Sequence, residues 1–167
     1  MSFAYYIKLY LATLAAFFVI DMLWLGLVAR NMYSKYLGFL LSPKPNWAAA
    51  IVFYLLFIVG ILVFAVLPGL EAGSLSKTLL LAGFFGLVTY ATYDLTNLAT
   101  IKNWPLTITI IDMIWGTVLS CLVAWVSFLV GNWLRYVDNH WRSLCNMEDF
   151  AFAPEIMIGF WSCWLVN

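Results

Sequence analysis

Apolar residues run through this chain in four long stretches, each separated from the next by a shorter and more polar segment. The stretches cover residues 9–29, 47–67, 79–99 and 105–130. Each is about as long as the roughly 20 residues that a helix needs to cross the hydrocarbon core of a bilayer. The pattern therefore predicts an all-α fold, an integral membrane four-helix bundle.

The connections between the stretches predict how the helices are arranged. Residues 30–46 contain three basic residues and two prolines, and residues 68–77 contain a proline and two glycines, so we expect both segments to be loops. The third connection, residues 100–104, is much shorter. It requires the third and fourth helices to form an antiparallel hairpin, with Pro105 in the first turn of the fourth helix.

The two ends of the chain need separate interpretation. The first apolar stretch contains Asp21 and has no small-residue cleavage site, so we interpret it as a retained helix and not as a secretion signal. The C-terminal segment is polar at first and then apolar, with Pro154 and Glu155 interrupting the apolar part, which is typical of an interfacial or disordered segment. We therefore predict a transmembrane domain over residues 1–134 and an atypical tail over residues 135–167.

Composition supports a membrane protein and excludes several classes of function. The chain is 65% hydrophobic and 10% charged, whereas a soluble domain is about half apolar and about a quarter charged. Eight basic and eight acidic residues give a formal net charge of zero, so the charge that nucleic acid binding requires is absent. The three cysteines have no CxxC spacing and the single histidine lies in the polar tail, so we expect no metal centre built from soft ligands and no cofactor. A hard cation held by carboxylates stays compatible with the sequence.

Three aspartates interrupt the apolar stretches: Asp21, Asp94 and Asp112. Ionisable side chains within hydrocarbon are costly and usually functional. At 1.5 Å rise per residue all three lie about 8–12 Å below one membrane face, because the first and third helices run one way and the fourth runs back. We therefore expect the three carboxyl groups to share one layer in the bundle interior. Three ionised acids would repel one another there, so the layer is a natural site for a proton or a cation.

Two of the aspartates belong to matching short motifs. Trp24 follows Asp21 by three positions, and Trp115 follows Asp112 by three positions. Each indole therefore lies on nearly the same helix face as its carboxyl group. The likeness of IDMLW to IDMIW indicates a pseudo-symmetric site between the first and fourth helices.

The third aspartate also has polar neighbours. Tyr90 and Asn97 lie four positions before and three positions after Asp94, so a phenol, an acid and an amide share one helical stripe. Basic residues are expected in the loops at the same end, where headgroup contact is their default role and a counterion or substrate clamp is the alternative. They are Arg30, Lys35 and Lys102. With the tail discounted, the balance of Lys and Arg slightly favours a cytoplasmic location for this face.

Structural roles compete with these functional interpretations. An intramembrane aspartate can serve only to bond a polar side chain on the next helix. Trp47, Trp104 and Trp133 fall at the ends of spans and are expected to anchor the protein at the membrane interface. Several glycines are expected to allow close helix packing and not to bind a ligand. They are Gly60, Gly83, Gly86 and Gly116.

Several motifs of the chain occur together in a known family. They include Asp21-x-x-Trp24, the YDLTN run at 93–97, Trp104-Pro105 and Asp112-x-x-Trp115-Gly116. In these motifs the chain resembles domain-of-unknown-function family 2177, over about residues 5–134. The resemblance implies a small multi-pass protein of the bacterial inner membrane, and it supplies no mechanism.

Three functions follow from these observations. The first is a membrane-embedded binding or transport module in which the three aspartates, aided by Asn97 and Tyr90, hold a proton, a cation or a cationic small molecule. Trp24 and Trp115 would then offer aromatic faces to the cargo, and a homodimer would complete a bundle of only four helices. The second is an intramembrane acid–base enzyme acting on a lipid or isoprenoid. The third is a structural accessory subunit surrounded by membrane lipids.

Overall fold

Every regular element of the computed structural model is helical within the part of the chain that it describes, which is residues 2–145 apart from 41 and 43. Four of the helical segments are long and apolar enough to cross a membrane. Side chains such as Leu27 and Leu80 point outward and are 79% and 76% exposed. An apolar exterior of this kind suits a lipid environment. The predicted all-α membrane fold is confirmed.

The first span is longer than the sequence indicates and contains a change of helix type. It consists of α1 (Phe3–Trp24), the π-helical segment η1 (Leu25–Ala29) and α2 (Arg30–Leu37). Ser2 caps the start of α1, where its hydroxyl accepts a hydrogen bond from the Tyr5 amide. The first helical segment therefore runs about two turns beyond its expected end.

This extension corrects the expected loop at residues 30–46. Arg30 and Lys35 lie on α2 and are exposed. The polar residues of this segment lower its hydropathy, but arginine and lysine are good helix formers. The polar residues after Ala29 therefore placed the predicted end of the span too early, and the helix itself continues to Leu37.

The second span also contains a π-helical segment. It consists of α3 (Trp47–Ile61), η2 (Leu62–Val66) and α4 (Leu67–Glu71). The expected loop at 68–77 is wrong in its first part, because Pro68 lies in the first turn of α4, where a missing amide hydrogen is tolerated. The chain then turns at Gly73, whose φ of 61° is the left-handed conformation that favours glycine.

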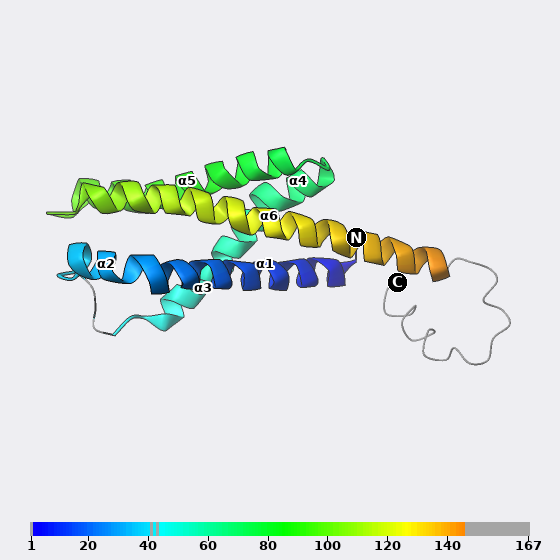
Figure 1. Cartoon of the computed structure of the whole chain (residues 1–167), viewed down its shortest axis with the longest axis horizontal. Coiled ribbons are helices and arrows are strands. Elements are labelled where there is room, and N and C mark those ends of the chain that lie inside the picture. Colours follow the sequence, from blue (N-terminus) through cyan, green and yellow to red (C-terminus); the bar gives the residue numbers. More distant parts are fainter. Residues whose placement is uncertain (1, 41, 43, 146–167) are drawn as a thin grey trace.

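The third and fourth spans form the predicted antiparallel hairpin (Figure 1). They are α5 (Leu75–Thr100) and α6 (Leu106–Cys145). The helix α6 begins at Leu106 and the Pro105 carbonyl accepts hydrogen bonds from the Ile108 and Thr109 amides, so this proline directly precedes the helix instead of lying in its first turn. Because α6 continues to Cys145, the first part of the expected tail is helical. The rest of the tail, residues 146–167, lies outside the described residues.

The glycines allow the helices to approach closely, as predicted. A Cβ atom at Gly86 would lie inside contact distance of the Gly116 carbonyl oxygen, and one at Gly116 would collide with the Tyr90 ring. A Cβ atom at Gly60 would likewise overlap the ring of Phe85. Close packing of this kind supplies much of the attraction between helices in lipid, where the hydrophobic effect does not act between them.

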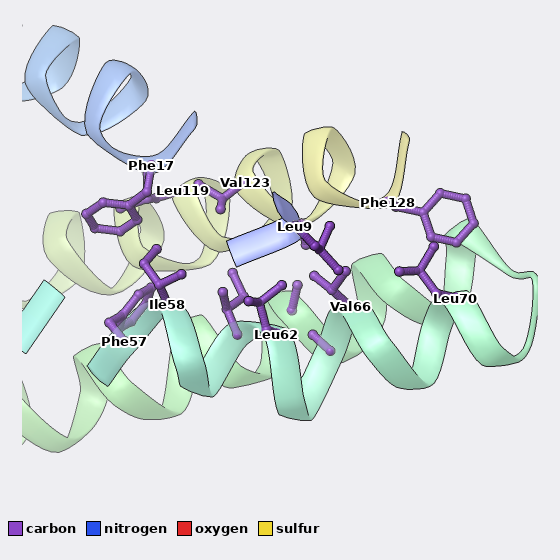
Figure 2. Close-up of a cluster of buried hydrophobic side chains, with 14 of the residues drawn as sticks. Leu9, Phe17, Phe57, Ile58, Leu62, Val66, Leu70, Leu119, Val123 and Phe128 are labelled. Carbon is purple, nitrogen blue, oxygen red and sulfur yellow. The ribbon is translucent and has the colours of Figure 1, made fainter. Parts of the chain in front are cut away.

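Two apolar clusters fill the interior. The main apolar cluster joins all four spans, and Figure 2 shows side chains of α3, η2 and α4 facing those of α1 and α6. The second apolar cluster is small and lies where α2 meets the α5/α6 hairpin; its buried members are Leu37, Trp104 and Ile108. Prominent members of the main cluster are Leu9, Phe17, Phe57, Ile58, Leu62, Val66, Leu70, Leu119, Val123 and Phe128.

One of the expected interface tryptophans is buried instead. Trp104 is 8% exposed, its indole N–H donates to the Thr109 hydroxyl at 3.1 Å, and its ring packs edge-on against Tyr93. Its interior hydrogen bond makes the prediction of an anchor wrong at this position. Trp47 and Trp133 are 71% and 61% exposed, as an interface anchor requires.

Candidate intramembrane acid site

The three aspartates of the candidate spans point into the protein. Asp21 on α1, Asp94 on α5 and Asp112 on α6 are 5%, 0% and 6% exposed. None of them faces the lipid, where a carboxyl group would be penalised by a few kcal/mol. We refer to these three residues as the acid layer.

The acid layer lies between the two apolar clusters. Along each helical span that carries an aspartate, a residue of the main apolar cluster lies on one side of it and a residue of the second apolar cluster on the other. The order is Phe17, Asp21 and Leu37 along the first span, Phe85, Asp94 and Leu98 along α5, and Leu119, Asp112 and Ile108 back along α6. Each acid therefore separates the two apolar clusters along its own span.

Tyr90 connects the members of the acid layer. Its ring is packed against the main apolar cluster and against Gly116. Its hydroxyl group lies close enough to all three carboxyl groups to interact with each of them electrostatically. The sequence assigned Tyr90 to Asp94 alone, and the structure places it near Asp21 and Asp112 as well.

Asp112 has a short hydrogen bond to a residue that the sequence did not single out. The Tyr33 hydroxyl of α2 donates to Asp112 Oδ1 at 2.6 Å. Tyr33 was overlooked because its segment was expected to be a loop. The signal that could have found it is a tyrosine among arginine and lysine, which are good helix formers and would have allowed the first helix to continue past Trp24.

Asp21 has a weaker partner of the same type. The Tyr54 hydroxyl of α3 donates to Asp21 Oδ2 at 3.5 Å, which is at the limit of hydrogen-bond distance. Asp21 and Asp112 are thus each approached by a tyrosine from a different helix. This parallel extends the likeness of the two Asp-x-x-Trp motifs to their surroundings.

The two motif tryptophans contact each other. The Trp24 and Trp115 rings are stacked, with centroids 4.2 Å apart and planes 8° apart. The Trp115 N–H lies near Asp21 and the Trp24 N–H lies near Tyr33, but both nitrogens are buried without a hydrogen bond. Because one face of each indole covers the other, the pair has no space between its rings for a ligand.

Asp94 has the most unusual environment of the three acids. Its side chain is fully buried and neither carboxyl oxygen has a hydrogen-bond partner. Asp112 acts on it electrostatically. Asn97, which was expected to assist Asp94, is half-buried and lies near the Tyr93 hydroxyl instead. A buried polar group without a partner is costly in the interior of any protein.

The remaining candidates lie apart from this layer. Arg30, Lys35 and Lys102 are exposed, so each has access to headgroups and none is buried beside the acids. Within the described part of the chain, no group of three or more His, Cys, Asp or Glu side chains is arranged to hold a metal ion. The acid layer therefore differs from a carboxylate cage for a divalent metal.

Apolar helices that carry acids on their inner face and aliphatic side chains on their outer face define a multi-pass integral membrane protein. Comparison with known families agrees with this class. The chain belongs to the family described as "Predicted membrane protein (DUF2177)", domain-of-unknown-function family 2177, whose pattern matches residues 6–129. No curated protein and no solved structure matches the chain.

Proposed function

We propose that this protein binds a proton, or a small inorganic cation in its place, at Asp94 within the membrane, as the exchange site of a binding or transport module. The observation that carries the proposal is the fully buried Asp94 carboxyl group with two unpartnered oxygens. An ionised carboxylate without a partner would be strongly disfavoured there. A proton or cation that arrives and leaves would neutralise this charge.

The neighbours of Asp94 support a division of roles within the acid layer. Asp112 is held by Tyr33 and Asp21 is approached by Tyr54, whereas Asp94 has no such bond. Asp112 also acts on Asp94 electrostatically, so its charge favours a positively charged species at that site. Asp94 is then the exchanging group and Asp112 the group that raises its affinity for positive charge.

The tryptophan pair favours a small cargo over a cationic organic molecule. An organic cation would be expected to lie against an open aromatic face. The faces of Trp24 and Trp115 that point toward each other are closed by stacking. Protons and small inorganic cations need no such surface.

The test uses the protein in liposomes and infrared difference spectroscopy, which detects carboxyl groups as they gain and lose protons or cations. Asp94→Asn should remove the band of the buried Asp94 carboxyl group from the difference spectrum that accompanies a change of pH or of sodium or potassium concentration. Glu71→Gln removes an exposed carboxylate at the end of α4 and serves as the matched control; it should keep the band of the buried carboxyl group and lose only a contribution from an exposed one. An unchanged signal in Asp94→Asn would overturn the proposal.

An acid–base enzyme is the second candidate, favoured by the contrast between adjacent carboxyl groups. Asp112 is hydrogen-bonded and Asp94 is not, and two carboxyl groups in different surroundings can act as general acid and general base. The substrate would be a lipid or isoprenoid. Lipid extracts from cells with and without the gene should differ in one lipid species if this candidate is correct, and should match if Asp94 serves only binding or transport.

The finer expectations about the setting of this site are part of the same proposal. We propose a bacterial inner membrane as its location, on the resemblance given above, and a homodimer as its assembled state. Four spans are few for a carrier, which is the reason for expecting two copies. Crosslinking in native membranes distinguishes a dimer from a monomer.

A further inference from the structure

A buried site that exchanges a proton or cation must become accessible to water at some point. Asp94 is 0% exposed in the structure, so at least one element around it has to move before a proton or cation from water can reach it. The helices that carry the acids are fixed by the main apolar cluster. The short helix α2 differs from them, because it packs against the second apolar cluster and not the main one.

The connection between α1 and α2 is a break in regular α-helical geometry. Residues Leu25–Ala29 are π-helical, and π-helical turns are rare, often functional and a recognised origin of helix bending. Only Ala29 is buried within this segment, and a Cβ atom at Gly26 would meet nothing within 4 Å. Little packing therefore holds η1 in place.

The packing of α2 is separate from the main core. Leu37 contributes to the second apolar cluster with Trp104 and Ile108, and the partly buried Leu98 packs against this cluster. Leu98 follows Asp94 by one helical turn on α5, so the two residues lie on the same helix face. The second apolar cluster therefore joins α2 to the α5/α6 hairpin one helical turn beyond Asp94.

One hydrogen bond joins α2 directly to the acid layer. It is the 2.6 Å bond from the Tyr33 hydroxyl to Asp112, the residue that acts electrostatically on Asp94. The hydrogen bond from α2 therefore ends at the carboxyl group that acts electrostatically on Asp94. Breaking this bond would free α2 and change the surroundings of Asp94 in the same step.

We propose that α2 is a lid hinged at η1, and that Tyr33 is the positioning residue that latches it over Asp94 and Asp112. When the Tyr33 bond to Asp112 breaks, α2 moves away and water at the near membrane face reaches Asp94. This inference rests on the proposed function, because a lid has meaning only if Asp94 exchanges a proton or cation. It assigns Tyr33 a role in access to the site.

The test measures how fast a water-soluble carbodiimide, which modifies accessible carboxyl groups, labels Asp94 in the full-length protein in liposomes. Tyr33→Phe removes the hydroxyl and keeps the ring. It should raise the rate of labelling at Asp94 about fivefold, the effect of losing one ordinary hydrogen bond from the closed state. Peptide mass spectrometry locates the modified residue.

Tyr36→Phe is the matched control. Tyr36 lies on the same short helix and packs against the same second apolar cluster, but it lies one turn nearer to the end of α2. The rate at which the carbodiimide labels Asp94 in Tyr36→Phe should equal the rate in the wild type. Amide hydrogen exchange gives a second measurement: residues 30–37 should exchange faster in Tyr33→Phe, with the α5/α6 hairpin unchanged.

An unaltered labelling rate in Tyr33→Phe would overturn the lid, and so would an equal increase in both tyrosine variants, because the effect would then be general loosening of α2. Either result leaves the infrared test of Asp94 untouched. Conversely, faster labelling in Tyr33→Phe together with an unchanged infrared signal in Asp94→Asn would retain the movable helix and reject the proposed exchange at Asp94. The two failures are therefore distinguishable.

Discussion

Trp24 and Trp115 stack face to face between α1 and α6, with their ring centroids 4.2 Å apart. Each follows an aspartate of the acid layer by three positions, and each indole N–H lies near the residues around the other motif's aspartate. The two motifs thus form one reciprocal contact between antiparallel helices. This contact joins the first span to the fourth at the level of the acids.

The first prediction concerns the stability that this stack provides. In a double-mutant cycle of Trp24→Leu and Trp115→Leu, the coupling free energy should be about 1 kcal/mol, as for other stacked aromatic pairs. Unfolding in mixed micelles with increasing denaturing detergent measures it. A control cycle of Trp24→Leu with Trp133→Leu, whose indole is 61% exposed, should give a coupling near zero. A value near zero for the stacked pair would contradict the prediction.

The second prediction compares the two tyrosine–aspartate hydrogen bonds. The cycle of Tyr33→Phe and Asp112→Ala should give a coupling free energy of about 1 kcal/mol, because the bond is 2.6 Å long and sheltered from water. The cycle of Tyr54→Phe and Asp21→Ala should give under about 0.5 kcal/mol, because its 3.5 Å distance is at the limit of bonding. The same unfolding assay applies. Equal couplings would show that the difference in distance has no energetic consequence.

The third prediction concerns the close contact of α5 with α6. Gly86→Ala should lower the free energy of unfolding by about 2 kcal/mol, because the added methyl group overlaps the Gly116 carbonyl and the helices must separate. Gly83→Ala is the graded control on the same helix. Its Cβ atom would lie 3.2 Å from the Cys121 sulfur, which a small shift can accommodate. A milder effect at Gly86 than at Gly83 would be inconsistent with this packing.

The fourth prediction separates a functional Asp94 from a structural one. Asp94→Val removes a buried polar group that has no hydrogen-bond partner, so the free energy of unfolding should stay unchanged or rise by about 1 kcal/mol. Asp112→Val breaks the bond to Tyr33 and should lower it. A marked loss of stability in Asp94→Val would favour the structural accessory subunit over an exchange site.

The fold was predictable where hydrophobicity decides it. Four apolar stretches and a short third connection were enough to give four spans and the α5/α6 hairpin. The boundaries were less accurate, because α2 remains helical through Arg30 and Lys35 despite its polarity. The π-helical segments had no signal in the sequence, since nothing in the apolar composition of Leu25–Ala29 distinguishes i→i+5 from i→i+4 bonding.

The orientation of the acids was predictable from the sequence, but their pairings were not. Counting along the helices indicated a shared level for Asp21, Asp94 and Asp112, and burial agrees with an inward orientation. Periodicity within one helix cannot state which side chain of another helix lies opposite. The bond from Tyr33 to Asp112 and the stacking of Trp24 depend on such contacts between helices, and the sequence therefore did not reveal them.

The length of α6 has a consequence for the two sides of the bilayer. At 40 residues it measures about 60 Å, since each residue adds about 1.5 Å, whereas the hydrocarbon core is only about 30 Å thick. Asp112 lies near the beginning of α6, and the helix continues past the start of α1 (Figure 1). The surplus length therefore lies at the end of the bundle away from Asp94, where α6 extends by itself beyond the start of α1.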